Sequence, residues 1–104
     1  TVAPYGALSF LPFTPIESKA ALEHMYKIPG LVGKYGLYDA YSYATKAQGD
    51  QPWIAESYLG IDKGLVLLMF ENYSTQLIWR LINQNVHIQK GLEVLKFRTV
   101  KIRL

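Results

Sequence analysis

The chain of 104 residues contains no cysteine, and only 18% of its residues are charged. The absence of cysteine excludes a disulfide scaffold, a thiolate metal site and a cysteine nucleophile. The low charge, set against a hydrophobic content of 50%, excludes a disordered tail and a charge-rich coiled coil. The net charge of +3 is small and the basic residues do not cluster, which argues against a nucleic-acid-binding protein.

The sequence also lacks long apolar runs and the common motifs of metal and phosphate sites. Its longest apolar run, residues 65–70, is far shorter than the ~20 residues of a membrane-spanning helix. His24 and His87 are isolated and have no metal-ligand spacing, so we expect plain surface or partly buried histidines. No glycine-rich phosphate loop or serine-nucleophile motif is present. The sequence therefore predicts no membrane span, no bound metal and no cofactor.

The apolar content is high for so short a chain. Half of the residues are hydrophobic and 13% are aromatic, whereas a small domain buries only about 60–65% of the surface of its unfolded chain. We therefore expect an exposed apolar face that packs on the remaining part of a larger fold or on a second copy. Thr1 opens the chain without a Met or a signal-peptide pattern, and we expect a fragment truncated at its N-terminus.

Two helices are expected in the first two thirds of the chain. Residues 14–17 (Thr-Pro-Ile-Glu) form a capping-box pattern, which predicts a helix that continues to Ile28 and stops at Pro29. Asp62 is predicted to N-cap a second helix. Residues 64–70 of that helix are apolar on every side, so we expect them to be buried all round.

The last third of the chain predicts two more helices and a strand. The second helix is expected to bend or break at residues 73–74, and a third helix follows over 75–83. Asn85 is predicted to cap a last helix over 86–95. Alternation of apolar and basic residues over 100–104 is typical of a strand.

Residues 30–60 form a long aromatic loop, punctuated by glycine, with a polar tip at 45–51. Its aromatic side chains are Tyr35, Tyr38, Tyr41, Tyr43, Trp53 and Tyr58. A loop of this length in a compact domain is usually functional. The rings either stack on the C–H faces of a sugar or pack the loop, and Tyr38 and Trp53 are the candidates for stacking. Asp39 either hydrogen-bonds a sugar hydroxyl or caps a turn.

Several short motifs follow one another in a characteristic order and spacing. They are residues 1–4, 11–15, 36–40, 58–64, 69–73, 77–79 and 88–92. Together they resemble the C-terminal part of the bacterial glucoamylase-like family, which includes endo-β-1,2-glucanases. Two positions depart from the family pattern, which typically has glutamine in place of Lys63 and proline in place of Leu65.

The resemblance implies a mainly α fold, the C-terminal part of an (α/α)6 toroid with a long aromatic loop and short strands. Residues 1–97 would then be a fragment of the catalytic domain, and 98–104 a strand-like tail. The implied activity is hydrolysis of β-1,2-glucan or a related glucan by carboxylate acid and base groups, with inversion. The implied partner is a glucan oligosaccharide or polysaccharide, and the implied location is the periplasm or the exterior of a bacterium.

Asp62 is the candidate catalytic residue, because the resemblance places it at the start of an inner helix that faces the cleft. As an N-cap close to backbone amides, its carboxyl is expected to have a lowered pKa; the alternative is a purely structural cap. The candidate substrate-binding residues are Tyr38, Asp39, Trp53 and Lys63, the last at the rim of the cleft. Glu71 lies on the face of the predicted helix opposite to Asp62, among apolar residues. We therefore expect its carboxylate to be buried and paired with Arg80 or an amide.

A second class of function stays open at this point. The chain could be a non-catalytic carbohydrate-binding or assembly module that uses the tyrosines of the loop as its contact surface. Saturable sugar binding by a chain that does not hydrolyse the sugar would favour that module over the hydrolase.

Overall fold

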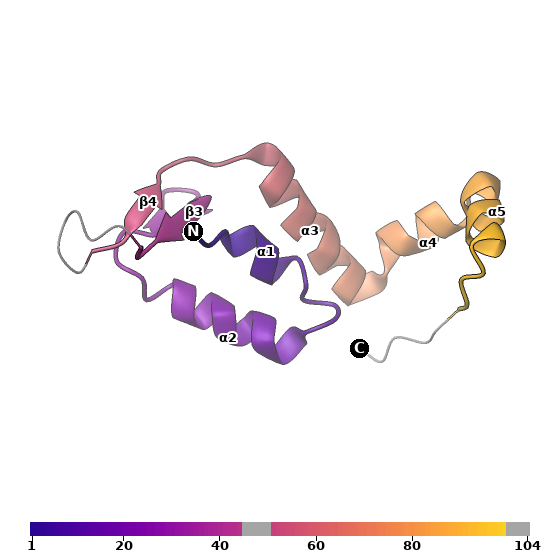
Figure 1. Ribbon diagram of the computed structural model, residues 1–104, viewed down its shortest axis with the longest axis horizontal. Coiled ribbons are helices and arrows are strands. Elements are labelled where there is room, and N and C mark those ends of the chain that lie inside the picture. Colours follow the sequence, from indigo (N-terminus) through magenta and orange to yellow (C-terminus); the bar gives the residue numbers. More distant parts are fainter. Residues whose placement is uncertain (45–50, 100–104) are drawn as a thin grey trace.

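The computed structural model describes residues 1–44 and 51–99 (Figure 1). Residues 45–50 of the predicted polar tip and the predicted strand over 100–104 lie outside this range. Residues 98–99 of the predicted tail have no regular secondary structure. The elements are α1 (Pro4–Leu8), α2 (Pro15–Met25), β1 (Val32–Gly33), β2 (Gly36–Leu37), β3 (Ala40–Ser42), β4 (Trp53–Ala55), α3 (Gly60–Thr75), α4 (Leu77–Asn83) and α5 (Val86–Val94). About half of the chain is helical, in agreement with the predicted mainly α class.

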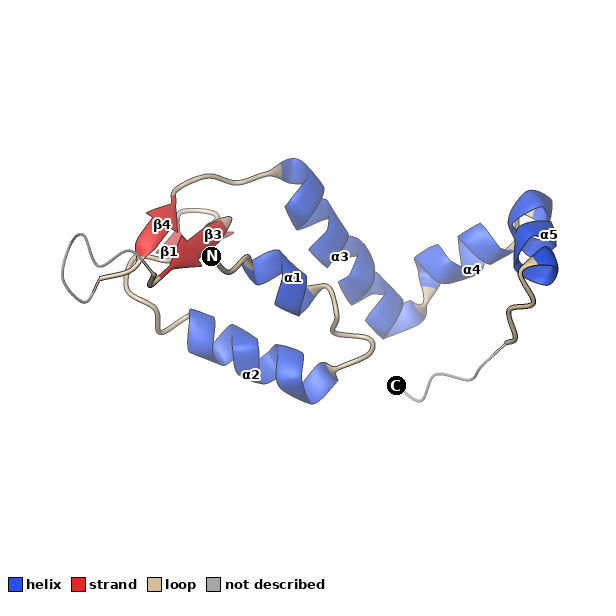
Figure 2. Cartoon of the chain, in the orientation of Figure 1, coloured by secondary structure: helices blue, strands red, loops and turns tan. Residues whose placement is uncertain are grey.

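The long aromatic loop contains two short antiparallel hairpins, which Figure 2 shows at the opposite end of the molecule from α5. In the first hairpin β1 pairs with β2, and in the second β3 pairs with β4. Val2 joins the second hairpin through two backbone hydrogen bonds with Tyr41, of 2.8 and 2.9 Å. This bridge fixes the chain just before α1 against β3.

The apolar core is small and lies where α1, α2 and the hairpins meet. Its buried side chains are Leu8, Met25, Ile28, Leu31, Leu37 and Tyr41. Leu31 has no exposed surface. A polar contact also joins the two helices, because the buried Ser18 donates from Oγ to the carbonyl of Ala7 at 2.9 Å. The core thus fixes the N-terminal helices against the loop rather than against α4 or α5.

The start and the end of α2 differ from the prediction. The Thr14 Oγ1 donates to the carbonyl of Phe10 and lies 3.1 Å from the Ser18 hydroxyl, and it accepts no amide of the first turn. The predicted capping box is therefore wrong, because the preceding turn already uses the hydroxyl. The helix ends at Met25, and Ile28 reaches the core from the turn that follows.

The junction between α3 and α4 lies at Gln76, beyond the break predicted at residues 73–74. Gln76 has a left-handed φ of 59°, which ends α3 and turns the chain into α4. The side chain of Asn72, only 1% exposed, accepts the amide of Trp79 at 3.1 Å and so satisfies one of the free N–H groups at the start of α4. Asn72 therefore joins the two helices through a contact that no pattern in the sequence predicts.

The apolar segment of α3 is not buried all round, so this prediction is wrong within the described residues. Gly64, Val66 and Met69 are half-buried, whereas Leu67 is 70% exposed and Leu68 is 45% exposed. The helix packs on α1, and Leu67 and Leu68 lie on the part of its surface that stays exposed. The predicted exposed apolar face is thereby confirmed.

Helices α4 and α5 extend away from the other elements (Figure 1), and the molecule measures 54 × 25 × 24 Å. Asn85 caps α5 as predicted, since its side chain accepts the amides of His87 and Ile88 at 2.9 and 3.3 Å. All residues of α5 are exposed. None of the described helices combines the length and apolarity that a membrane span requires.

Candidate functional site

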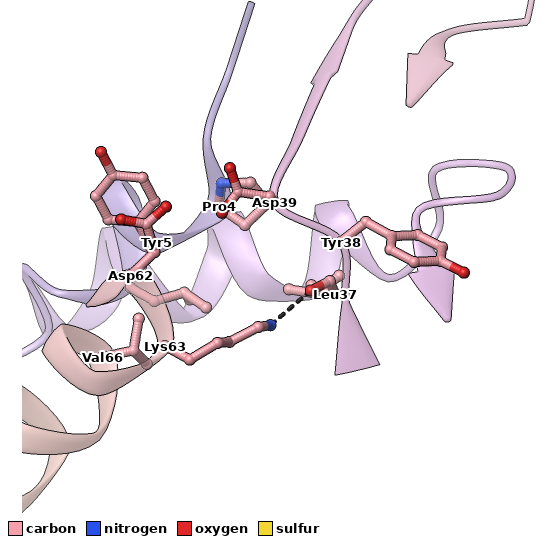
Figure 3. Close-up of a pocket in the computed structure, with 9 residues that line it drawn as sticks. Pro4, Tyr5, Leu37, Tyr38, Asp39, Asp62, Lys63 and Val66 are labelled. Atoms are coloured by element: carbon pink, nitrogen blue, oxygen red, sulfur yellow. Dashed lines mark hydrogen bonds between the residues drawn. The ribbon is translucent and has the colours of Figure 1, made fainter. Parts of the chain in front are cut away.

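The first turn of α3, the start of α1 and the segment after β2 form a small pocket (Figure 3). It is lined by Pro4, Tyr5, Leu8, Leu37, Tyr38, Asp39, Asp62, Lys63 and Val66. Its volume of about 40 Å³ is room for about three water molecules, at about 10–15 Å³ each. A water molecule or a single sugar hydroxyl fits in this space, whereas a sugar ring would have to lie outside it.

Asp62 lies inside the first turn of α3 rather than at its N-cap. The helix begins at Gly60, and Leu59 occupies the cap position. The Leu59 carbonyl accepts the amides of Asp62 and Lys63 at 3.1 and 3.0 Å. The predicted cap is therefore wrong, because the helix begins three residues earlier than a cap at Asp62 would require, and the Asp62 carboxyl lines the pocket instead.

The carboxyl groups of Asp62 and Asp39 line the same pocket and act on each other. Asp39 follows β2, and its amide donates to the Ser57 carbonyl at 3.0 Å, which fixes the backbone at this point. The pKa of Asp62 is raised, first by the hydrogen bond with the Asp39 carboxyl, then by burial and by repulsion from the Asp39 charge. Two carboxyl groups can share a hydrogen bond only if one of them carries a proton. The predicted lowered pKa is wrong, because a second carboxyl outweighs the helix amides.

Tyr38 packs within the loop. Its ring stacks on that of Tyr58 with centroids 5.0 Å apart, and it points away from the two carboxyl groups in Figure 3. The Tyr58 hydroxyl accepts the amide of Tyr35 at 3.0 Å. Burial raises the pKa of the Tyr38 phenol, with smaller contributions from Tyr58 and Glu56. Tyr58 thus occupies one face of the Tyr38 ring, so Tyr38 packs the loop as the second of its two expected roles, the first being to stack on a sugar.

Gly33 makes this tyrosine packing possible. A Cβ atom at this position would collide with the hydroxyl of Tyr58 and with the ring and hydroxyl of Tyr38. The close approach of both side chains therefore requires glycine at position 33.

Lys63 reaches from α3 across to β2. Its Nζ donates to the carbonyl of Leu37 (Figure 3) and lies 5.5 Å from the centre of the Tyr58 ring. Trp53 is half-exposed in β4, opposite Ser42, and it does not line the pocket. Four of the five predicted site residues are thus brought together, and Trp53 stands apart from them.

Other candidate groups lie outside this pocket. Glu71 is partly exposed and accepts from the Thr75 hydroxyl at 2.9 Å, so the predicted pairing with Arg80 or an amide is wrong. A hydroxyl one helical turn away supplies the donor. His24 and His87 are exposed side chains, as expected. Over residues 1–44 and 51–99, no group of three or more histidine or carboxylate side chains is placed to hold a metal ion.

The Glycoamylase family, described as "Putative glucoamylase", matches residues 1–86. An exo β-1,2-glucooligosaccharide sophorohydrolase (non-reducing end) of Parabacteroides distasonis is 35% identical over 103 residues, which are 97% of this chain and 13% of that protein. The endo-β-1,2-glucanase of Chitinophaga pinensis, solved with sophorotriose and glucose, has 38% identity and a TM-score of 0.72 over 88% of this chain and 21% of its own.

The crystal structure of a "putative glucoamylase" from Bacteroides fragilis NCTC 9343 has 37% identity and a TM-score of 0.76 over 96% of this chain and 22% of its own. The chain thus spans about an eighth of the curated relative and about a fifth of each solved relative. The match of the family over most of the chain agrees with the motifs in the sequence and with the similar structures. The chain belongs to the glucoamylase-like family, whose members of similar sequence include β-1,2-glucan hydrolases.

Proposed function

We propose that this chain is part of a glycoside hydrolase that acts on β-1,2-glucan or a related glucan. In this proposal it forms the C-terminal part of an (α/α)6 toroid and contributes one wall of the substrate cleft. The names of its relatives support the substrate class. The observation that carries the proposal is the placement of the Asp39 and Asp62 carboxyl groups in one small pocket, close enough to affect each other.

The pair acts as one unit rather than as the acid and the base on either side of a glycosidic bond. Hydrogen-bonded oxygens lie about 2.5–3.0 Å apart. The two catalytic carboxyl groups are about 5–5.5 Å apart in retaining glycosidases and about 6.5–9.5 Å apart in inverting ones. The second catalytic carboxyl group is therefore expected from outside the described residues, facing this pair across the substrate.

The raised pKa gives Asp62 a role in the inverting reaction. A carboxylate with a raised pKa is a stronger base than an ordinary one once it is ionised. In this proposal the ionised Asp62 accepts a proton from the water that attacks the sugar, and Asp39 holds that water or a sugar hydroxyl. The pocket has room for such a water beside both carboxyl groups. The general acid that protonates the leaving oxygen is the carboxyl group outside this part of the chain.

The test is hydrolysis of β-1,2-glucan oligosaccharides by the full-length protein that carries this chain. The variant Asp62→Asn should lower turnover by about 10²-fold or more, the usual scale of general base catalysis. Glu71→Gln is the matched control and should leave turnover unchanged, since Glu71 contacts Thr75 and lies outside the pocket. Unchanged turnover of Asp62→Asn would remove Asp62 from the mechanism. The configuration of the released sugar, followed by NMR, tests inversion.

A non-catalytic assembly or carbohydrate-binding module is the second candidate, and the exposed apolar side chains of α3 and α4 favour it. Leu67 of α3 and Leu81 of α4 are 70% and 54% exposed. A full-length protein that binds the glucan saturably and releases no product would establish this second function and exclude the first.

A further inference from the structure

Lys63 connects two of the segments that form the pocket, α3 and β2. It follows Asp62 directly in the first turn of α3, and its ammonium donates to the carbonyl of Leu37, two residues before Asp39. Leu37 is 4% exposed and belongs to the core, so the acceptor is held in place. One side chain thus joins the helical turn that carries one carboxyl group to the strand that leads to the other.

A second contact holds the ammonium over the loop. It lies 5.5 Å from the centre of the Tyr58 ring, a cation–π distance. Tyr58 is itself fixed, because its hydroxyl accepts the amide of Tyr35 and its ring stacks on Tyr38, the residue before Asp39. The backbone on either side of Tyr38 is therefore tied to α3 through Lys63.

The side chain of Lys63 does not point to the carboxyl pair. In Figure 3 it runs along the pocket to Leu37, while the carboxyl of Asp62 turns toward Tyr5 and Asp39. The titratable groups that face Asp62 are Asp39 from the segment after β2, Tyr5 from α1 and Lys63 on its own helix. The contributions to the pKa of Asp62 come from Asp39 and from burial, and all of them raise it.

We propose that Lys63 is a positioning residue, which holds the Asp39 carboxyl against that of Asp62 by joining α3 to the Leu37 carbonyl. This inference deepens the proposed function and rests on it for its consequence in catalysis. In this role Lys63 contacts the backbone of Leu37 and not the substrate.

The pKa of Asp62 distinguishes positioning from a direct effect of the lysine charge. A cation that acts directly on a carboxylate lowers its pKa, so removal of that cation raises the pKa. Removal of a positioning residue has the opposite sign, because the Asp39 carboxyl moves away and no longer raises the pKa of Asp62. The direction of the change therefore decides between the two roles.

The experiment is an NMR titration of the Asp62 carboxyl carbon in the full chain and in two variants. Lys63→Met keeps most of the apolar stem and loses the donor, and the pKa of Asp62 should fall toward its ordinary value. Lys34→Met is the matched control, because Lys34 lies 5.2 Å from the Tyr35 ring in the same group of tyrosines and does not line the pocket. In Lys34→Met the pKa of Asp62 should equal its value in the wild type.

An unchanged or higher pKa of Asp62 in folded Lys63→Met would overturn the inference. If that variant does not fold, Lys63→Leu takes its place, with a smaller apolar side chain that also lacks a donor. Here too a fall supports the positioning role and an unchanged or higher pKa overturns it. The wild-type protein's hydrolysis of glucan is a separate readout. If the pKa of Asp62 falls in the variant but the wild type does not hydrolyse glucan, the positioning role of Lys63 stands and the proposed function is refuted. If the wild type hydrolyses glucan but the pKa does not fall, only the inference about Lys63 is refuted.

Discussion

The N-terminal body, formed by α1, α2, the two hairpins and the first turns of α3, contrasts with the arm formed by α4 and α5. The body contains the buried core, and contacts between residues far apart in sequence fix its pocket. In the arm all residues of α5 are exposed, and Asn85 caps this helix. In α4 only Ile78 and Trp79 are half-buried, and the Trp79 ring lies 5.7 Å from that of Phe13 in the body. The carboxyl pair therefore depends on tertiary packing, whereas the arm has few contacts with the body and leaves apolar side chains such as Leu81 exposed.

The largest expected difference between the two regions is the cost of removing a leucine side chain. Leu31→Ala should lower the free energy of unfolding by about 2–5 kcal/mol, because Leu31 is fully buried in the body. Leu81→Ala in the arm should change it by less than about 0.5 kcal/mol, since Leu81 is 54% exposed. Urea unfolding followed by circular dichroism measures both. Equal losses in the two variants would show that α4 is packed as tightly as the core.

Glycine substitutions should have opposite signs in the two regions. Gly33→Ala should destabilise the body by about 1–3 kcal/mol, because the new Cβ collides with the Tyr58 hydroxyl and with the ring and hydroxyl of Tyr38. Gly91→Ala in α5 meets no neighbouring atom and should stabilise that helix by about 0.5–1 kcal/mol. Thermal unfolding of the two variants checks the signs, and a neutral Gly33→Ala would mean that the tyrosine pair is free to move.

Asn72 is the link between the body's long helix and the arm, and its removal should loosen the arm. Asn72→Ala leaves the Trp79 amide without its acceptor and should cost about 1–2 kcal/mol. Hydrogen exchange of the Trp79 amide should become faster in this variant. The control is Asn83→Ala, where the side chain is exposed and makes no hydrogen bond among the described residues. If exchange at Trp79 is the same in both variants, the Asn72 contact does not join the helices.

The smallest expected effect is the pH dependence of stability that arises from the pair. Because the pKa of Asp62 is higher in the folded chain, the folded state binds its proton more tightly than the unfolded state does. The stability from this group is present below the ordinary pKa of aspartate and is lost as the pH rises through the raised pKa. The stability of Asp62→Asn relative to the wild type should therefore increase with pH in that window. Urea unfolding at a series of pH values checks this, and two parallel curves would contradict it.

Local patterns predicted the arm better than they predicted the pocket. The Asn85 cap was predictable, because the residues it contacts lie two and three positions further along the chain. The Thr14 cap was wrong because the hydroxyl bonds back to the preceding turn. The break after α3 was misplaced because it depends on the left-handed backbone of Gln76 and on the Asn72 contact, neither of which has a periodic signal.

The candidate site was predictable as a set of residues but not in its chemistry. Four of its five predicted members line one pocket, since the family motifs carry them. The pairing of Asp39 with Asp62 joins residues 23 positions apart, so no local pattern reveals it. The sign of the pKa shift at Asp62 was wrong for the same reason. Trp53 was chosen as an aromatic residue of the loop, and the β3–β4 pairing places it away from the pocket.

The most direct test of the central claim is the pKa of the Asp62 carboxyl, measured by NMR titration in the wild-type chain and in Asp39→Ala. The paired carboxyl groups predict a pKa above the ordinary value of 3.8 in the wild type. They also predict a fall in that pKa when Asp39 is removed, since the hydrogen bond and the repulsion are both lost. An ordinary pKa in the wild type, or a raised pKa that persists in Asp39→Ala, would contradict the pairing.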